Sequence, residues 1–343
     1  MNIVPFEKMH IPMARQLALM AYQQEKQQVS ALPMITETPD LQAYAENGMG
    51  VAAFQDDRMV GFLCATGPFA NAFHSTKATG VFSPMGCHGV VGENRGRVYG
   101  RMYQAAAEKW VKAGAVSHAI CLYAHDEEAQ RQFFQYGFGM RCADAIRQVS
   151  PVACQPCAGY DLLELPKEDW CRVHPLELAL HDHYCQSPFF MCRQPDDLPT
   201  FLAASRQENA RYFAALQQGQ LCAYLKIIGP GETFVADGGS YRHVHGAYCL
   251  PEHRGQGLYA SLLNHVVCVL AKEGITHLGV DFETINPTAN GFWRKHFAAY
   301  THSVVRRIDE NILSIGGTSH ATTVQPPVYR GDRSGSHLHR GFR

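Results

Sequence analysis

The chain has no long apolar run that would mark a membrane-spanning or secreted protein. Its 343 residues include no apolar segment near the ~20 residues that a membrane-spanning helix requires. The opening stretch, MNIVPFEKMHIPMARQ, has no apolar core of a signal peptide. We therefore expect a cytoplasmic protein with no membrane partner.

An excess of charge of either sign is also missing. Thirty Lys and Arg balance 31 Asp and Glu, which gives a formal net charge of -1. Nucleic-acid-binding domains usually carry a basic surface, so this balance argues against DNA or RNA as a partner. A small molecule or a particular protein is the expected partner, and the chain is expected to be a monomer or a homodimer.

Metal-binding motifs are scarce. The twelve cysteines are scattered and include a single CxxC, Cys154 and Cys157, which supplies half of a tetrahedral zinc site. The 18 histidines form no HExxH pattern. We predict reduced thiols and no metal site.

What the sequence does contain is a repeat. A shift of 160 residues brings identical residues into register at comparable places in two stretches of the chain, and such a period is a sign of duplicated structure. The matching pairs are Tyr99 and Tyr259, Lys112 and Lys272, Gly114 and Gly274, Ala129 and Ala289, and Arg147 and Arg307.

Each copy follows the same order of expected elements: a strand, a helix, a hairpin, a strand, a long helix, a strand, a short helix and a last strand. The hairpins lie at 50–65 and 211–228, and glycines end the long helices at 114 and 274. We predict one domain at 1–150, a linker at 151–165, a second domain at 166–316 and a flexible tail at 317–343.

The sequence PEHRGQGLYASLL, residues 251–263, runs from a strand into an amphipathic helical pattern. Gly255 and Gly257 allow a turn in which successive N–H groups converge at the helix start, where the helix dipole is positive. Arg254 adds a charged donor. Such a site suits a pyrophosphate, although an ordinary strand-to-helix turn has similar residues.

This loop resembles the acyl-CoA signature of the GNAT N-acetyltransferases, with Arg254 and Gly257 matching and Tyr259 standing where Gly or Ala is usual. The stretch NPTANGFW, which begins at Asn286, resembles the next motif of that superfamily, and HDEEAQRQFFQYGFG is its counterpart in the first copy. The order of elements is similar as well. The resemblance covers nearly the whole chain except the tail.

The resemblance implies an α/β (α+β) fold of two tandem GNAT-like domains, each with a mixed, largely antiparallel sheet flanked by helices. It also implies acetyl-CoA as the acyl donor. The expected cofactor-binding residues are Cys249, Leu250, Arg254, Gly255, Gln256, Gly257, Leu258, Tyr259, Asn286, Ala289 and Trp293. In the first copy Asn94 and Arg97 replace Arg254 and Gly257, so we expect that copy to be degenerate.

Several residues are candidates for the proton transfers of the reaction. His243 and His245 alternate on one strand, and Glu283 follows the neighbouring strand, so each is a candidate general base. Trp293 stands where resembling enzymes carry a Tyr acid, which leaves Tyr300, Tyr259 or solvent to protonate the thiolate.

The resemblance thus implies transfer of an acetyl group from acetyl-CoA to an amine of a small molecule or protein, with the C-terminal domain catalytic. The alternative is a non-catalytic acyl-CoA sensor or regulatory module. We expect the acceptor near residues 181–197, where Phe189 and Phe190 are candidate lining residues.

Overall fold

The computed structural model describes residues 1–72, 77–229, 231, 233–236 and 238–315. The predicted tail at 317–343 lies outside the described residues. None of the described helices is long and apolar enough to cross a membrane.

The N-terminal half of the chain runs from the first strand to the seventh. Its elements are β1 (Asn2–Pro5), α1 (Ile11–Gln28), α2 (Gln42–Glu46), β2 (Val51–Gln55), β3 (Arg58–Leu63), β4 (Gly80–Ser83), β5 (His88–Val90), α3 (Arg95–Lys112), β6 (Ser117–Tyr123), α4 (Glu127–Gln135) and β7 (Gly139–Gln148).

The C-terminal half follows a similar order, with one strand where the first half has β4 and β5, and with a two-residue strand and a short helix added near its end. Its elements are β8 (Asp161–Glu164), α5 (His174–Cys185), α6 (Leu198–Gln207), β9 (Arg211–Gln217), β10 (Gln220–Ile228), β11 (Tyr241–Cys249), α7 (Leu258–Lys272), β12 (His277–Glu283), α8 (Pro287–His296), β13 (Ala298–Ala299), β14 (Thr301–Arg307) and α9 (Asn311–Ile315). The predicted hairpins are β2–β3 and β9–β10. The predicted mixed, largely antiparallel α/β fold is confirmed.

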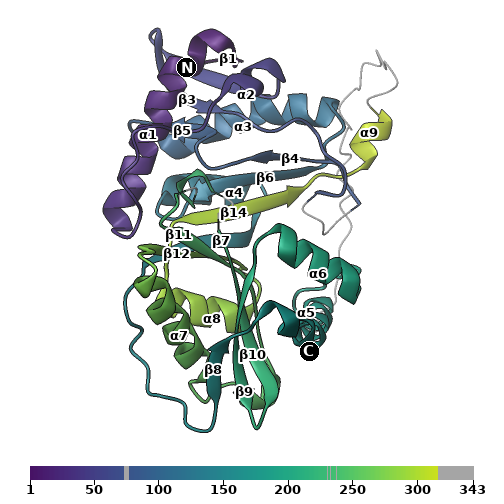
Figure 1. Ribbon diagram of the computed structural model, residues 1–343. Coiled ribbons are helices and arrows are strands. Elements are labelled where there is room, and N and C mark those ends of the chain that lie inside the picture. The colour runs from purple at the N-terminus through teal and green to yellow at the C-terminus, as the bar shows by residue number, and fades with distance from the viewer. Residues whose placement is uncertain (73–76, 230, 232, 237, 316–343) are drawn as a thin grey trace, which may run out of the picture.

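The long helix of each half is amphipathic. Apolar residues recur at helical spacing and face the sheet, while Gly114 and Gly274 follow each helix with φ of 86° and 77°, a conformation that favours glycine. The buried residues of α7 are Leu258, Ser261, Leu262, Leu263, Val266, Val267 and Leu270. Helices α7 and α8 cover one face of the second half's strands, and α5 and α6 cover the other (Figure 1).

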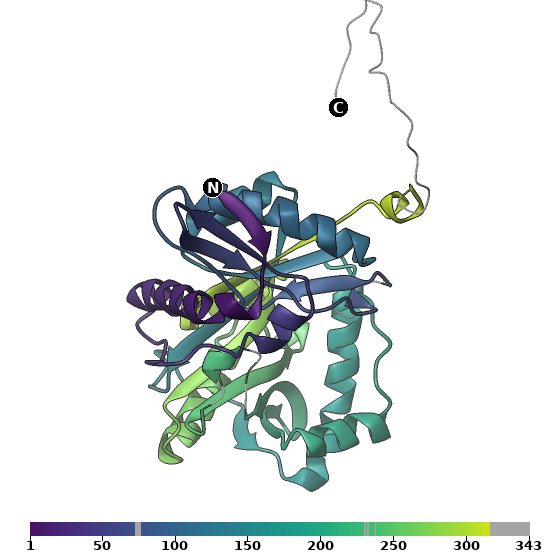
Figure 2. The ribbon, with the colours of Figure 1, turned by 90° about the horizontal axis from the view of Figure 1, so that it is seen from above.

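The two halves exchange their last strands. The larger sheet has the order β4-β6-β14-β7-β12-β11-β10-β9-β8. Strand β14 from the second half pairs with β6 of the first half along its whole length. Strand β12 of the second half pairs along its whole length with β7 of the first half. Both views show the yellow-green β14 among the strands of the first half (Figure 1, Figure 2).

This exchange joins the halves through buried groups as well as backbone pairing. The backbone N–H of Asp144 on β7 donates to the hydroxyl of Thr301 on β14 over 3.0 Å, and both side chains are buried. An apolar cluster at the junction takes residues from both halves, including Tyr22, Ile146, Tyr241 and Tyr300. Neither half is therefore closed without a strand of the other.

We expect that fragments 1–150 and 151–343, expressed separately, do not unfold cooperatively, whereas the whole chain does. Fragment 1–150 would expose β7 on both edges, and fragment 151–343 would leave β12 and β14 without their antiparallel partners. Thermal unfolding followed by circular dichroism tests this. Cooperative unfolding of each fragment near the midpoint of the whole chain would contradict it.

Candidate active site

The site begins where two neighbouring parallel strands separate. Strands β11 and β12 are in register from Tyr241 and His277 to Val244 and Val280. Beyond these residues β11 continues to Cys249 and β12 to Glu283, but β12 now follows β7 and β11 follows β10. The strands thus open a gap between their C-terminal ends, the usual place for a ligand in a sheet with parallel strands.

A β-bulge at His245 determines which face of the sheet each side chain of β11 lies on. Lys226 on β10 lies opposite Gly246, and the next residue, Ile227, lies opposite Val244, so His245 is the extra residue. The bulge shifts the alternation by one. Val244 and Cys249 therefore both pack in the core beneath α7 and α8, whereas Gly246 faces Glu177 of α5.

Backbone donors line the open edge of β11. The N–H of Leu250 donates to the carbonyl of Cys222 over 2.9 Å, which places Leu250 in a hydrogen-bonded pair with β10. Hydrogen-bonded and non-bonded pairs alternate along an antiparallel ladder. The N–H groups of Ala247 and Cys249 therefore point away from β10 and into the gap.

The loop before α7 forms the anion-binding end of the site. Gly255 and Gly257 have φ of 75° and 80°, and Gly257 is the N-cap of the helix. The first hydrogen bond of α7 runs from the N–H of Ser261 to Gly257, so the preceding N–H groups of the first turn have no partner within the helix. Arg254 donates its Nε–H to the carbonyl of Cys249 over 2.8 Å, which anchors the side chain beside these donors.

A pocket of about 410 Å³ joins the loop to the gap, within the size range of small-molecule sites. Its lining includes nine of the eleven predicted cofactor residues, all except Leu250 and Gln256. The nine are Cys249, Arg254, Gly255, Gly257, Leu258, Tyr259, Asn286, Ala289 and Trp293.

The two predicted residues outside the lining have other roles. Gln256 donates its side-chain amide to the carbonyl of Glu252 over 3.0 Å, and the N–H of Leu250 belongs to the ladder with β10.

Asn286 begins the second helix that lines the pocket. It is the N-cap of α8, and its side-chain oxygen accepts from the N–H of Ala289 over 3.1 Å. Trp293 is buried one turn beyond Ala289 and meets the ring of Tyr259 at 6.2 Å between centroids. Tyr259 also donates its hydroxyl to the carbonyl of Tyr224 over 3.0 Å. Tyr259, which stands where the resembling signature has Gly or Ala, therefore links α7 to β10 of the sheet.

Glu283 lies at the end of β12, on the face opposite the α7 core, as its neighbours show: Phe282 and Val280 pack in that core. One carboxylate oxygen is 3.4 Å from Nη2 of Arg141, and the other is buried with no hydrogen-bond partner among the described residues. Burial raises the pKa of Glu283, and the charges of Arg141 and Arg193 oppose that rise. This oxygen can accept a proton or a hydrogen bond from an incoming group.

The two candidate histidines differ in access. His243 is only 2 % exposed, and both ring nitrogens are engaged, with Asp281 at 2.7 Å and the hydroxyl of Tyr241 at 3.0 Å. His245 has a side chain that is 38 % exposed and lies 3.9 Å from Glu208. Burial and nearby Lys226 lower the pKa of His245, which favours the neutral imidazole. Of the two, only His245 presents its ring to solvent.

Tyr300 is not brought to the pocket. It is buried in the junction between the halves, and its hydroxyl lies 2.7 Å from the hydroxyl of Thr233. Burial raises the pKa of Tyr300 well above its usual value. A proton donor for the thiolate would need to come from another group.

Helix α5 supplies residues that the motif-based reasoning did not single out. His183 lines the pocket, and burial and the charge of Arg254 lower its pKa. Tyr184 is the next residue of α5, and burial and the charge of Glu283 raise its pKa to about 12. Phe189 is buried against His183, at 5.0 Å between ring centroids, but Phe190 is 73 % exposed. No sequence motif marks α5, because its contribution depends on packing.

The corresponding place in the first half is filled by protein atoms. The N–H of Gly96 at the start of α3 donates to the side-chain carboxylate of Glu128 on α4 over 3.3 Å. A Cβ atom on Gly96 would lie 3.0 Å from the carbonyl oxygen of Glu128. Arg95 pairs with Asp126, the N-cap of α4, at 3.2 Å. A carboxylate therefore occupies the helix start that a phosphate would need.

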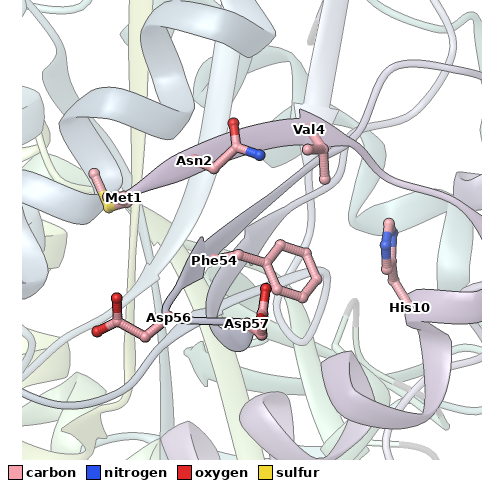
Figure 3. Close-up of a pocket in the computed structure, with 7 residues that line it drawn as sticks. All are labelled: Met1, Asn2, Val4, His10, Phe54, Asp56 and Asp57. Carbon is pink, nitrogen blue, oxygen red and sulfur yellow. The ribbon is translucent and has the colours of Figure 1, made fainter.

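A second hollow, of about 590 Å³, lies at the edge of the first half (Figure 3). Two carboxylates and no Lys or Arg line it, which makes it a poor place for a phosphate group. None of the predicted site residues is among its lining residues, which are Met1, Asn2, Val4, His10, Phe54, Asp56 and Asp57.

Comparisons with known proteins agree with the geometry of the second half. Residues 178–298 match the model of the Acetyltransferase (GNAT) family. No curated protein matches the sequence. A GCN5-related N-acetyltransferase from Sphaerobacter thermophilus superposes with a TM-score of 0.54 at 14% identity, over 89% of this chain and 95% of that one. At this identity the likeness shows the fold alone.

Two further structures superpose with TM-scores below 0.5. One is a tandem GNAT protein from the clavulanic acid biosynthesis pathway, with a TM-score of 0.45 at 16% identity over 89% of this chain and 98% of that one. The other is a GNAT-family acetyltransferase from Colwellia psychrerythraea, with a TM-score of 0.46 at 12% identity over 90% and 100%. Residues 178–298, which carry the pocket-lining residues of β11, α7 and α8, are thus the part of the chain that matches the acetyltransferase (GNAT) family.

Proposed function

We propose that the protein transfers an acetyl group from acetyl-CoA to an amine of a small molecule or protein, and that the C-terminal half is the catalytic one. The observation that carries this proposal is the continuous path from the start of α7 to the gap between β11 and β12. The path is lined at one end by Arg254 and Gly257 and at the other by Ala247.

Each part of the path suits a part of the donor. The first turn of α7 offers N–H groups and the positive end of the helix dipole to the pyrophosphate. The gap lets the extended arm of the donor pass between the strands, where the N–H groups of Ala247 and Cys249 can donate to the thioester carbonyl as negative charge develops. The first half offers no such place at α3, because Glu128 occupies it.

Glu283 is the general base that the geometry favours. It lies on the face of β12 toward α5, across the gap from the pocket, and has one buried oxygen without a protein partner among the described residues. A carboxylate with a raised pKa is better matched to removing a proton from an ammonium group than an ordinary one. His245 is the second candidate, since its neutral ring is exposed to solvent.

We expect Gly257→Val to weaken acetyl-CoA binding by at least about tenfold, because a branched residue disfavours the positive φ that aims these N–H groups. Arg97→Val is the matched control, since Arg97 is the counterpart of Gly257 at the shift of 160 residues and is exposed. Calorimetric titration of acetyl-CoA measures both. Equal loss in the two variants, or loss in Arg97→Val alone, would contradict the assignment of the donor to the second half.

We expect Glu283→Gln to lower kcat by roughly 100-fold, the lower range for loss of a general base, and to leave acetyl-CoA affinity within about twofold. In the unmodified protein the rate should fall as the pH drops through the raised pKa of Glu283, because only the carboxylate accepts the proton. CoA release in the presence of a panel of primary amines, followed by chromatography, measures the rate.

These experiments distinguish an acetyltransferase from a non-catalytic acyl-CoA sensor. An unchanged kcat in Glu283→Gln would exclude Glu283 as the base and direct attention to His245. Acetyl-CoA binding without turnover of any amine would support a non-catalytic acyl-CoA sensor.

A further inference from the structure

The strand exchange carries a side chain of the first half to the candidate base of the second. Strand β7 lies beside β12, and Cys142 is directly opposite Glu283. The preceding residue, Arg141, places Nη2 of its guanidinium 3.4 Å from Oε1 of Glu283. The pairing of β7 with β12 is what brings Arg141 to Glu283.

The pair is shielded from water. The side chains of Arg141 and Glu283 are 18 % and 15 % exposed, respectively. An ion pair in such a place is screened far less than a surface pair, and removing one partner leaves the other charge poorly solvated. The pair is therefore able to determine both the orientation of the carboxylate and its ionisation.

The backbone of Arg141 is held as firmly as its side chain. Its carbonyl accepts from the N–H of Thr284 over 2.7 Å and from the hydroxyl of Thr284 over 3.0 Å. Thr284 directly follows Glu283 at the end of β12. The residue after the candidate base is thus fixed to the residue that carries the guanidinium.

We propose that Arg141 is a positioning residue of the C-terminal half's active site, which orients the carboxylate of Glu283 through one oxygen and leaves the other, buried oxygen without a protein partner in the described part of the chain, as the atom that would take the proton of the acceptor amine. This inference rests on the proposed function. In this proposal the first half contributes a residue to acetyl transfer, although Glu128 occupies the place in that half where a donor's phosphate would bind. The two halves then share one active site.

Other charged groups also act on Glu283. Arg193, from the segment between α5 and α6, lowers its pKa, and Asp281 on the same strand raises it. Tyr184 of α5 is within electrostatic range of both carboxylates. Among these groups, Arg141 is the one with a direct ion-pair contact to Glu283 in the described residues.

The test compares Arg141→Gln and Arg141→Lys with a control on the same strand, Arg147→Gln, in the full-length protein. The guanidinium of Arg147 donates to the carbonyls of Gln148 and Ser150, away from β12's C-terminal end. We expect Arg141→Gln to lower kcat about tenfold, with acetyl-CoA affinity unchanged, and to move the acidic limb of the pH profile to higher pH. Arg141→Lys, which keeps the charge, should recover part of both.

A second measurement does not depend on turnover. The protein is labelled with glutamate carrying ¹³C at the side-chain carboxyl, and the resonance of Glu283 is identified by its loss in Glu283→Gln. We expect its titration to move to higher pH in Arg141→Gln and to stay at the wild-type position in Arg147→Gln. The direction follows from loss of a neighbouring positive charge.

The results distinguish the failure of this inference from the failure of the proposed function. If acetyl-CoA binds and Arg141→Gln leaves both the titration of Glu283 and the pH profile unchanged, the role of Arg141 is overturned and the proposed function stands. If the unmodified protein binds no acetyl-CoA, the proposed function fails, and the role of Arg141 in acetyl transfer fails with it.

Discussion

The pairing of β7 with β12 on one side and with β14 on the other holds the two halves together, and the site depends on it. Because β12 follows β7 along its whole length, its last residues stay with β7 while β11 stays with β10. The gap between β11 and β12 is the result. A strand of the first half thus supports the opening in the second, and the backbone hydrogen bonds of a sheet do the positioning.

The two copies also show how one fold supports different sites. In the second half the start of α7 is open, with Gly257 in a conformation that keeps its N–H groups exposed to a ligand. In the first half Glu128 of α4 supplies a carboxylate to the start of α3. A helix N-terminus favours negative charge in both halves. At α3 the carboxylate of Glu128 supplies this charge, and at α7, in our proposal, the pyrophosphate of the donor supplies it.

Much of the fold follows from the sequence, because the signals involved are local. The period of 160 residues, the hairpin turns, the amphipathic helices and the glycines after them all depend on residues close together in the chain. The loop at 254–257 was identifiable for the same reason. The exchange of β7 and β14 could not be predicted from the sequence, because the residue pattern of a strand does not determine which strand it pairs with.

In the site, too, the sequence indicates local features but not which residues packing and strand pairing bring together. His243 and His245 are two residues apart, yet one is buried against Asp281 and the other is exposed at a bulge that no spacing rule marks. Tyr300 has a suitable hydroxyl, but packing places it in the junction between the halves. Arg141 lies 142 residues before Glu283, and only the pairing of β7 with β12 brings them together.

The central claim is that acetyl-CoA binds at the start of α7 and not at the start of α3. Hydrogen–deuterium exchange of the full-length protein, with and without acetyl-CoA, tests it directly because the same experiment follows both helices. The account predicts slower exchange at the amides of residues 255–260 and 247–249, with no change at 95–100. Protection at 95–100, or no protection at 255–260, would contradict it.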